Sequence, residues 1–172
     1  MEEKLVLVDE NDQEIGEAEK MEAHRAGKLH RSFSIFVCNS RGEMLLQRRA
    51  AGKYHSGGLW TNACCGHPRP GEQTQQAARR RLREEMGFEC ELKEIFQFIY
   101  KVKLDRDLCE YEFDHVFFGI YEGEVTPAPE EVSEFKWVSP PALTEDVKKH
   151  PEHYTEWFKI ALERALKSLA IH

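Results

Sequence analysis

The stretch GHPRPGEQTQQAARRRLREEMG, residues 66–87, decides how this chain folds. Residues 72–86 have helical composition and stop at Gly87, a residue favoured just past the end of a helix. On a helix, position 81 faces positions 84 and 85, so Arg81 would lie beside Glu84 and Glu85. We therefore predict a helix over residues 72–86 with charged side chains on one face.

The residues just before this helix, TNACCGHP at 61–68, place a thiol two residues from an imidazole. On an extended segment Cys65 and His67 would share one face and could address one site, which suggests proton chemistry beside a metal. The plainer interpretation is that Cys65 is a small buried hydrophobic residue. A structural zinc site is disfavoured, because the adjacent pair of cysteines has no Cys-x-x-Cys spacing.

The rest of the chain predicts further strands and two more helices. Apolar, β-branched and aromatic runs predict strands at residues 5–8, 32–38, 44–48, 92–104, 109–121 and 134–138. Residues 39–42 predict a hairpin turn, and Pro127 and Pro129 mark a loop. Pro140 can open a short helix, and residues 154–169 carry an apolar helical face that includes Trp157.

Composition limits the class of protein. A chain of 172 residues with 41% hydrophobic content fits one domain with a sizeable core. There is no run of eighteen apolar residues and no secretory signal at the acidic start, so we expect a cytoplasmic protein that does not bind membranes. Five cysteines in no regular framework favour reduced thiols. A net charge of -7 argues weakly against nucleic-acid binding, and the basic clusters near Arg49 and Arg81 could be solvated faces.

Histidines and glutamates at several places could hold a metal ion. Glu110 and Glu112 would project from the same face of a strand. With His24, His30 and His67 they could form a sphere of three imidazoles and two carboxylates, which suits Mn²⁺ or Zn²⁺ better than Ca²⁺. Taken alone, each histidine is more often an ordinary core or surface residue, and a Glu-x-Glu pair can be a solvated strand.

The helix segment resembles the Nudix box. Gly66, Glu72, Arg80, Leu82, Glu84, Glu85 and Gly87 stand at the fixed positions of that motif, and Phe88 is an apolar substitute at its end. Only Arg81 departs, at the position where hydrolases of the family have a metal-binding glutamate. Arg81 can pair with Glu84 or Glu85, or contact phosphate oxygens, and either use weakens the cluster that activates water. The resemblance therefore implies that a diphosphate is held and not cut.

From about residue 8 to residue 170 the chain resembles the type I isopentenyl-diphosphate isomerases, a branch of the Nudix superfamily. This implies an α/β (α+β) fold, with one Nudix-like domain over residues 1–172 and a mixed sheet flanked by helices. Carried over by position, the catalytic residues are Cys65, Glu112 and Tyr100, and the ligands of a second divalent ion, Mn²⁺, Zn²⁺ or Mg²⁺, are His24, His30, His67, Glu110 and Glu112. Glu85 would bind Mg²⁺ with the diphosphate, and Lys20, Arg49, Lys53, Arg81 and Trp157 would bind the substrate.

The resemblance also implies the reaction. Such enzymes interconvert isopentenyl and dimethylallyl diphosphate by adding a proton to one end of the allylic unit and removing one from the other, which supplies isoprenoid synthesis. Trp157 would face the carbocation, although core packing on an amphipathic helix explains it equally well. A Nudix hydrolase and a metal-binding adaptor without turnover are the alternatives. Arg81 speaks against the first, and the presence of Cys65 with the His and Glu set speaks against the second.

Overall fold

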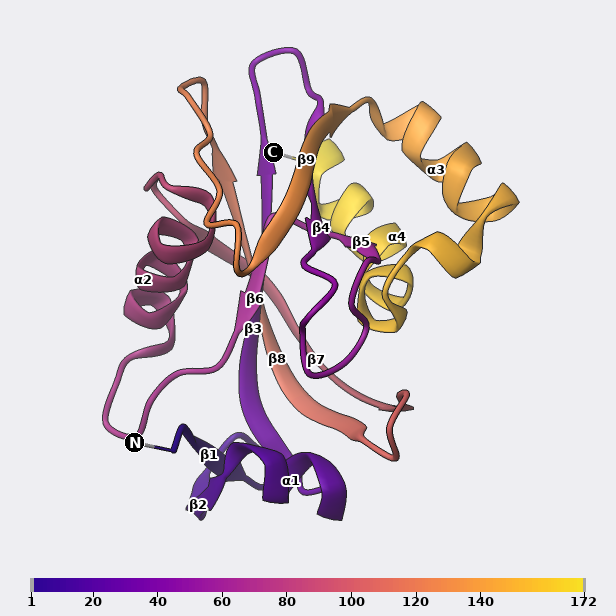
Figure 1. Cartoon of the computed structure of the whole chain (residues 1–172). Helices are drawn as coiled ribbons and strands as arrows, with labels where there is room; N and C mark the ends of the chain where they lie inside the picture. Colours follow the sequence, from indigo (N-terminus) through magenta and orange to yellow (C-terminus); the bar gives the residue numbers. More distant parts are fainter. Residues whose placement is uncertain (1, 172) are drawn as a thin grey trace.

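The chain folds around one mixed β-sheet with helices on both sides, in a computed structural model that describes residues 2–171 (Figure 1). The strands are β1 (Lys4–Val8), β2 (Glu14–Glu19), β3 (His30–Cys38), β4 (Met44–Arg49), β5 (Trp60–Thr61), β6 (Cys64–Gly66), β7 (Lys93–Lys103), β8 (Cys109–Ile120) and β9 (Val132–Val138). The helices are α1 (Lys20–Ala26), α2 (Thr74–Met86), α3 (Pro140–Lys149), the 3₁₀ turn η1 (Pro151–His153) and α4 (Glu156–Ile171). The predicted α/β fold with a mixed sheet is confirmed.

The central strand β3 connects the parts of the sheet. It runs parallel to β8, with His30 opposite Glu112, and antiparallel to β6, with Ser34 opposite Cys65. β7 pairs with β8 over almost its whole length, as predicted for the two long strands. The predicted hairpin turn at residues 39–42 is formed, because the amide of Gly42 donates to the carbonyl of Asn39. Its ladder is short, since β3 and β4 pair at a single position, Cys38 with Met44. β4 then leaves to pair with β9 and β5, which opens the sheet beside β6.

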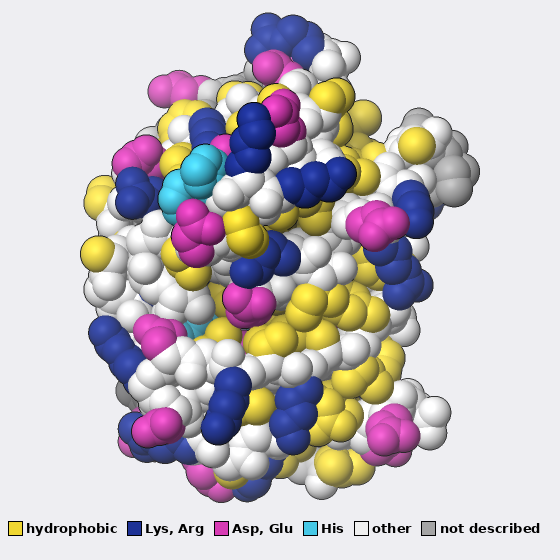
Figure 2. All heavy atoms as spheres, turned by 90° about the vertical axis from the view of Figure 1, so that its right-hand side faces the viewer, with side chains coloured by type: hydrophobic (Ala, Val, Ile, Leu, Met, Phe, Trp, Pro, Cys, Tyr) yellow, Lys and Arg dark blue, Asp and Glu magenta, His cyan; other side chains and the backbone are white. Residues whose placement is uncertain are grey.

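Two apolar layers hold the helices on the sheet. α2 packs through Ala77, Leu82 and Met86 against Phe33 and Ile35, which are fully or almost fully buried. On the other side, α4 packs through Phe158, Ala161 and neighbouring apolar residues. On the face that carries α3 and α4, hydrophobic side chains lie between charged ones (Figure 2). None of the described helices is long and apolar enough to cross a membrane.

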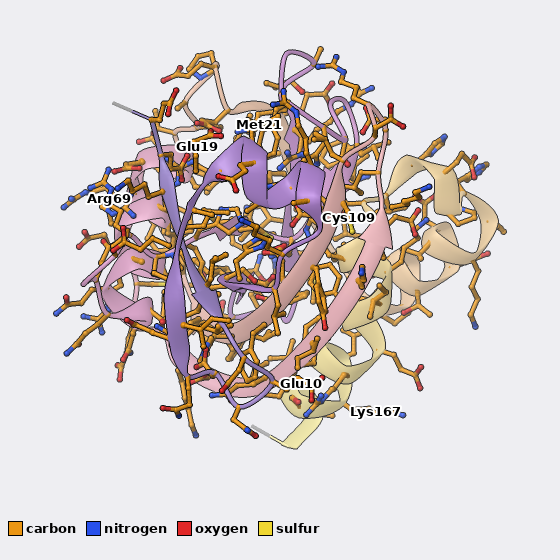
Figure 3. All side chains as sticks on the ribbon, turned by 90° about the horizontal axis from the view of Figure 1, so that it is seen from below. Glu10, Glu19, Met21, Arg69, Cys109 and Lys167 are labelled. Carbon is orange, nitrogen blue, oxygen red and sulfur yellow. The ribbon has the colours of Figure 1, made fainter. Side chains whose placement is uncertain are left out.

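The main difference from the predicted elements is α1. This helix has only seven residues and ends at Gly27, whose φ of 63° is left-handed. The side chain of Glu19 caps its first turn by accepting from the amides of Met21 and Glu22. α1 lies across one end of the sheet together with β1 and β2, with Glu19 and Met21 at its start (Figure 3). Such a short helix carries too little periodicity to be predicted from sequence.

The end of α2 requires glycine for two reasons. Gly87 has a φ of 76°, and a Cβ built there would lie 2.3 Å from the carbonyl oxygen of Thr126. The segment after it is held close because the amides of Thr126 and Ala128 donate to the carbonyls of Met86 and Glu85. We expect Gly87→Ala to lower the free energy of unfolding by at least about 2 kcal/mol, measured by urea denaturation.

The matched control is Gly42→Ala. Gly42 has the same φ of 76°, but an added Cβ would meet nothing within 4 Å. The free energy of unfolding of this variant should fall only by the cost of a left-handed backbone for alanine, about 1 kcal/mol. Equal losses in the two variants would show that the contact with Thr126 costs nothing.

Candidate functional site

A cavity of about 870 Å³ opens between the sheet, α2 and α4. Ten helices and strands contribute residues to its lining, among them Ser34 of β3, Arg49 of β4, Cys65 of β6, Arg81 of α2, Tyr100 of β7, Glu112 of β8 and Trp157 of α4. The cavity lies where β4 leaves β3 and β6 takes its place. The sheet topology therefore brings together residues that are far apart in the sequence.

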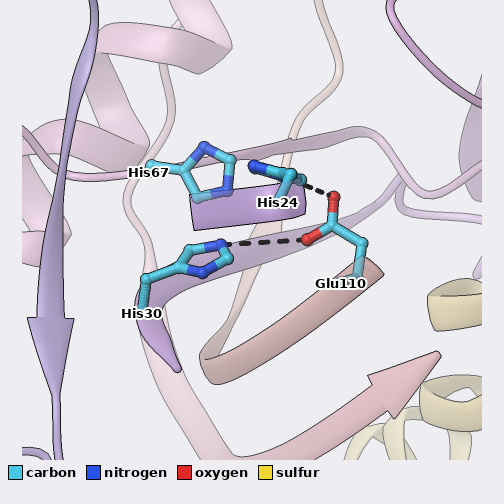
Figure 4. Close-up of side chains that lie close together, drawn as sticks. All are labelled: His24, His30, His67 and Glu110. Atoms are coloured by element: carbon cyan, nitrogen blue, oxygen red, sulfur yellow. Dashed lines mark hydrogen bonds and ion pairs between the residues drawn. The ribbon is translucent and has the colours of Figure 1, made fainter. Parts of the chain in front are cut away.

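Four of the five predicted metal ligands, His24, His30, His67 and Glu110, lie close together (Figure 4). His67, Glu110 and the fifth, Glu112, line the cavity. His24 Nε2 lies 2.9 Å from one oxygen of Glu110, and His30 Nε2 lies 3.8 Å from the other. His67 Nε2 lies 3.3 Å from Glu112, which also stands 3.8 Å from His30. As predicted, Glu110 and Glu112 project from one face of β8. All five side chains are buried.

The hydrogen bonds of the histidines prepare them to bind a cation. His24 Nδ1 donates to the carbonyl of Lys20 at 2.7 Å, and His30 Nδ1 donates to the carbonyl of Lys28 at 2.9 Å. Each ring therefore turns a bare Nε2 lone pair toward the carboxylates. Burial lowers the pKa of both histidines to about 4, so both are neutral at neutral pH.

Three buried atoms at this place have no hydrogen-bond partner among the described residues: His30 Nε2, His55 Nε2 and Glu110 Oε2. A buried polar atom left in this way costs about 1–3 kcal/mol, so a native protein normally satisfies it. A divalent ion between the imidazoles and the carboxylates would do so with the nitrogen and oxygen ligands that such ions prefer. The residues present therefore fit a metal centre.

A fourth histidine, His55, belongs to the same cluster and was missed by the sequence analysis. Its Nε2 lies 2.7 Å from Glu110, and its side chain is almost fully buried. Burial, followed by the charge of Arg49, lowers its pKa to about 2. His55 lies in the loop between β4 and β5, where no periodic pattern marks a functional residue. The ring of its neighbour Tyr54 packs edge-on against it. The ammonium of Lys20 lies over the Tyr54 ring, 4.4 Å from the ring centre.

Cys65 and Glu112 line the cavity from different strands. The predicted extended segment at Cys65 is confirmed, because it lies in β6. Burial, followed by the charge of Asp114, raises the pKa of the thiol to about 12. Glu112 accepts a hydrogen bond from the hydroxyl of Tyr100. Burial and then repulsion from Glu112 raise the pKa of Glu110, so the pair of carboxyls retains a proton readily.

Arg81 forms the ion pairs predicted for it. Its guanidinium donates to Glu84 at 2.7 Å and to Glu85, and lies 3.4 Å from Glu131. The carboxylates that would gather magnesium ions in a hydrolase are thus held by a cation. Glu131 was missed by the sequence analysis, since it lies in the loop before β9 and reaches α2 only through the fold.

The other cations predicted to bind substrate also line the cavity. Lys20 pairs with Glu3 at 3.0 Å, and Lys53 pairs with Glu131. Arg49 is nine-tenths buried, donates to the carbonyl of His55 at 3.1 Å and keeps its Nε without a partner among the described residues. Its guanidinium lies 5.2 Å from the centre of the Trp157 ring. Trp157 both lines the cavity and packs in the core beneath α4.

Comparison with known proteins identifies the family of the chain. Residues 28–158 match the NUDIX domain family. The chain is 53% identical over its full length to isopentenyl-diphosphate Delta-isomerase 2 of Aromatoleum aromaticum, covering 91% of that protein. It is 52% identical to the isopentenyl-diphosphate Delta-isomerase of Burkholderia multivorans, with 96% and 94% of the two chains covered.

Solved structures show the same fold at lower identity. A structure from Deinococcus radiodurans superimposes with a TM-score of 0.72 at 22% identity, over 86% of this chain and 90% of that one. The MutT protein of Methanosarcina mazei superimposes with a TM-score of 0.65 at 22% identity, over 79% and 91%. These likenesses concern the fold, whereas the relatives above share half of their residues with this chain. The chain therefore belongs to the Nudix family, in the branch of the isopentenyl-diphosphate Delta-isomerases.

Proposed function

We propose that the protein interconverts isopentenyl diphosphate and dimethylallyl diphosphate and so supplies isoprenoid synthesis. The observation that carries the proposal is the content of one cavity. It contains a thiol, Cys65, a carboxyl held by a tyrosine, Glu112 with Tyr100, and cations in number sufficient for a diphosphate. The relatives that share half of the sequence carry the name of this activity.

The two groups fit a reaction that moves a double bond. A proton added to one carbon of the alkene gives a tertiary carbocation, and loss of a proton from another carbon gives the isomer. One group must donate a proton and another must accept one, and Cys65 and Glu112 are the two proton-transfer groups. Trp157 offers the cation an aromatic face with no lone pair to trap it. The burial of the site limits attack by water, which would give an alcohol.

Binding energy comes from the diphosphate end of the substrate. Lys20, Arg49, Lys53 and Arg81 contact its oxygens, with Mg²⁺ held by Glu85. His24, His30, His67, Glu110 and Glu112 would hold Mn²⁺, Zn²⁺ or Mg²⁺ at the His/Glu centre. A divalent ion held there would supply positive charge beside Glu112, which would orient that carboxyl and tune its affinity for a proton.

The experiment that tests the proposal is incubation of the purified protein with isopentenyl diphosphate and Mg²⁺ in deuterated water, followed by NMR. We expect dimethylallyl diphosphate with deuterium incorporated, and no product after treatment with a chelator. An unchanged substrate in the presence of intact, metal-loaded protein would contradict the proposal. Phosphate or nucleoside monophosphate released from nucleoside diphosphates would instead indicate a hydrolase, and metal binding without any turnover would indicate an adaptor.

The position of Arg81 gives a further prediction. Arg81→Glu should raise KM for isopentenyl diphosphate at least about tenfold, because it removes a cation from the phosphate site and adds a third negative charge beside Glu84 and Glu85. It should not produce an efficient hydrolase, since water access and substrate shape are unchanged. KM and phosphate release are measured on the same preparation.

The matched control is Arg83→Glu on the same helix. Arg83 is exposed and pairs with Glu89, away from the cavity lining. KM should stay within about twofold of the wild type, since the charge change there is screened by solvent. Efficient hydrolysis by Arg81→Glu would show that this one position separates the two activities.

A further inference from the structure

The thiol of Cys65 has two polar neighbours. Its Sγ lies 3.5 Å from the hydroxyl of Ser34 and 3.3 Å from Oδ1 of Asn62. Ser34 is directly opposite Cys65 in the antiparallel pairing of β3 and β6. Residues that face each other in this way have their side chains in contact on the same side of the sheet.

Asn62 can offer the thiol only an acceptor. Its amide nitrogen donates to the carbonyls of Ile35 and Cys64, both at 2.9 Å. The amide oxygen is therefore the atom that faces Cys65, and it also accepts from the hydroxyl of Thr61 at 2.8 Å. Asn62 is fully buried, so this orientation is fixed.

Ser34 is held in turn by a buried carboxyl. Its hydroxyl donates to Oδ2 of Asp114 at 2.6 Å, while Ser32 donates to Oδ1 of the same carboxyl at 3.3 Å. Asp114 is 1% exposed and follows Glu110 and Glu112 on the same face of β8. Because its hydrogen bond to the buried carboxyl of Asp114 is short, the hydroxyl of Ser34 does not rotate freely. The sulfur of Cys65 therefore has a hydroxyl partner of fixed orientation.

We propose that Ser34 and Asp114 are positioning residues for the reacting thiol, with Ser34 in contact with Cys65 and Asp114 fixing Ser34. The inference rests on the proposed function, in which Cys65 exchanges a proton with a substrate carbon. Proton transfer to carbon needs the reacting atoms about 3–3.5 Å apart, and a displacement of about 1 Å can cost roughly 100-fold in rate. A thiol is a weak hydrogen-bonding group, so its rotamer depends on the neighbours that the fold supplies.

The two serines on β3 allow a matched test. Ser34→Ala and Ser32→Ala each remove one hydroxyl from Asp114, but the hydroxyl of Ser34 is the one in contact with the thiol. In the holoenzyme we expect Ser34→Ala to lower kcat for isomerisation at least tenfold, with KM within twofold of the wild type. Ser32→Ala should leave both constants within twofold.

A kcat for Ser34→Ala equal to that of the wild type would overturn the inference. An equal loss in Ser32→Ala would also overturn it, because the effect would then come from disturbing Asp114 and not from the thiol contact. If Ser34→Ala does not fold, Ser34→Cys in the presence of reductant keeps the size and removes the strong donor, with the same expected loss. Wild-type protein that does not isomerise the substrate would refute the proposed function itself, which is a different result from active wild type with an active Ser34→Ala.

Discussion

Replacing Cys65 with alanine is expected to lower kcat for isomerisation by roughly 10²–10⁴-fold, the usual contribution of a positioned acid or base. The methyl group of alanine fills part of the space but can neither give nor take a proton. Burial, followed by the charge of Asp114, raises the pKa of the Cys65 thiol to about 12, so it holds its proton in the free enzyme. The measurement is the NMR assay in deuterated water at saturating substrate.

Two controls separate this effect from a loss of structure. The metal content and the thermal denaturation of Cys65→Ala should match the wild type, since the thiol contributes little buried surface. Cys90→Ala removes another partly buried cysteine, which packs at the edge of the α2 core and does not line the cavity. That variant should keep its full kcat. Full activity in Cys65→Ala would refute the assigned role of the thiol.

The helix α2 was predictable because its signals are local. Arg81, Glu84 and Glu85 meet through the spacing of one helical turn, and Gly87 ends the helix with a left-handed φ. The structure begins the helix at Thr74, two residues later than predicted. Helix starts are less well defined, and Gln73 makes no side-chain capping bond here.

The alternation of side chains along β8 was also predictable from the sequence, but only in part. Glu110 and Glu112 were expected on one face of a strand, and both lie there. Asp114 continues the same alternation and escaped notice, because a third carboxyl on a strand could equally face water. Its burial depends on contacts with β3, a strand about 80 residues earlier in the chain. Sequence spacing fixes the face of a side chain, whereas the fold decides whether that face is covered.

The candidate ligand His24 and its neighbour His55 show the limit of prediction from local sequence. His24 was named as one of several candidate ligands, but no predicted element placed it, because α1 was not predicted; this short helix brings the ring against Glu110, which is 86 residues away in the sequence. His55 lies in an irregular loop held by Arg49, and no pattern in that loop indicates a buried imidazole. Both depend on tertiary contacts that join short elements to the centre of the sheet.

Glu112→Gln should lower kcat by roughly 10²–10⁴-fold and also weaken the binding of a divalent ion at the His/Glu centre. Glutamine keeps the size of the side chain and can still accept from Tyr100. It cannot carry a proton between substrate and enzyme, and its neutral oxygen is a poorer metal ligand than a carboxylate. The measurements are kcat and the metal bound per chain.

Glu110→Gln is the variant that separates the two roles of Glu112. Glu110 contacts His24, His30 and His55, but the hydroxyl of Tyr100 bonds Glu112 instead. Both variants should lose metal affinity, at least about tenfold, because each removes an anionic ligand. Excess Mn²⁺ should then restore much of the activity of Glu110→Gln and little of that of Glu112→Gln. If excess metal restored both equally, Glu112 would act only as a ligand, and the second proton-transfer group would have to be sought elsewhere in the cavity, with Tyr100 the nearest hydroxyl.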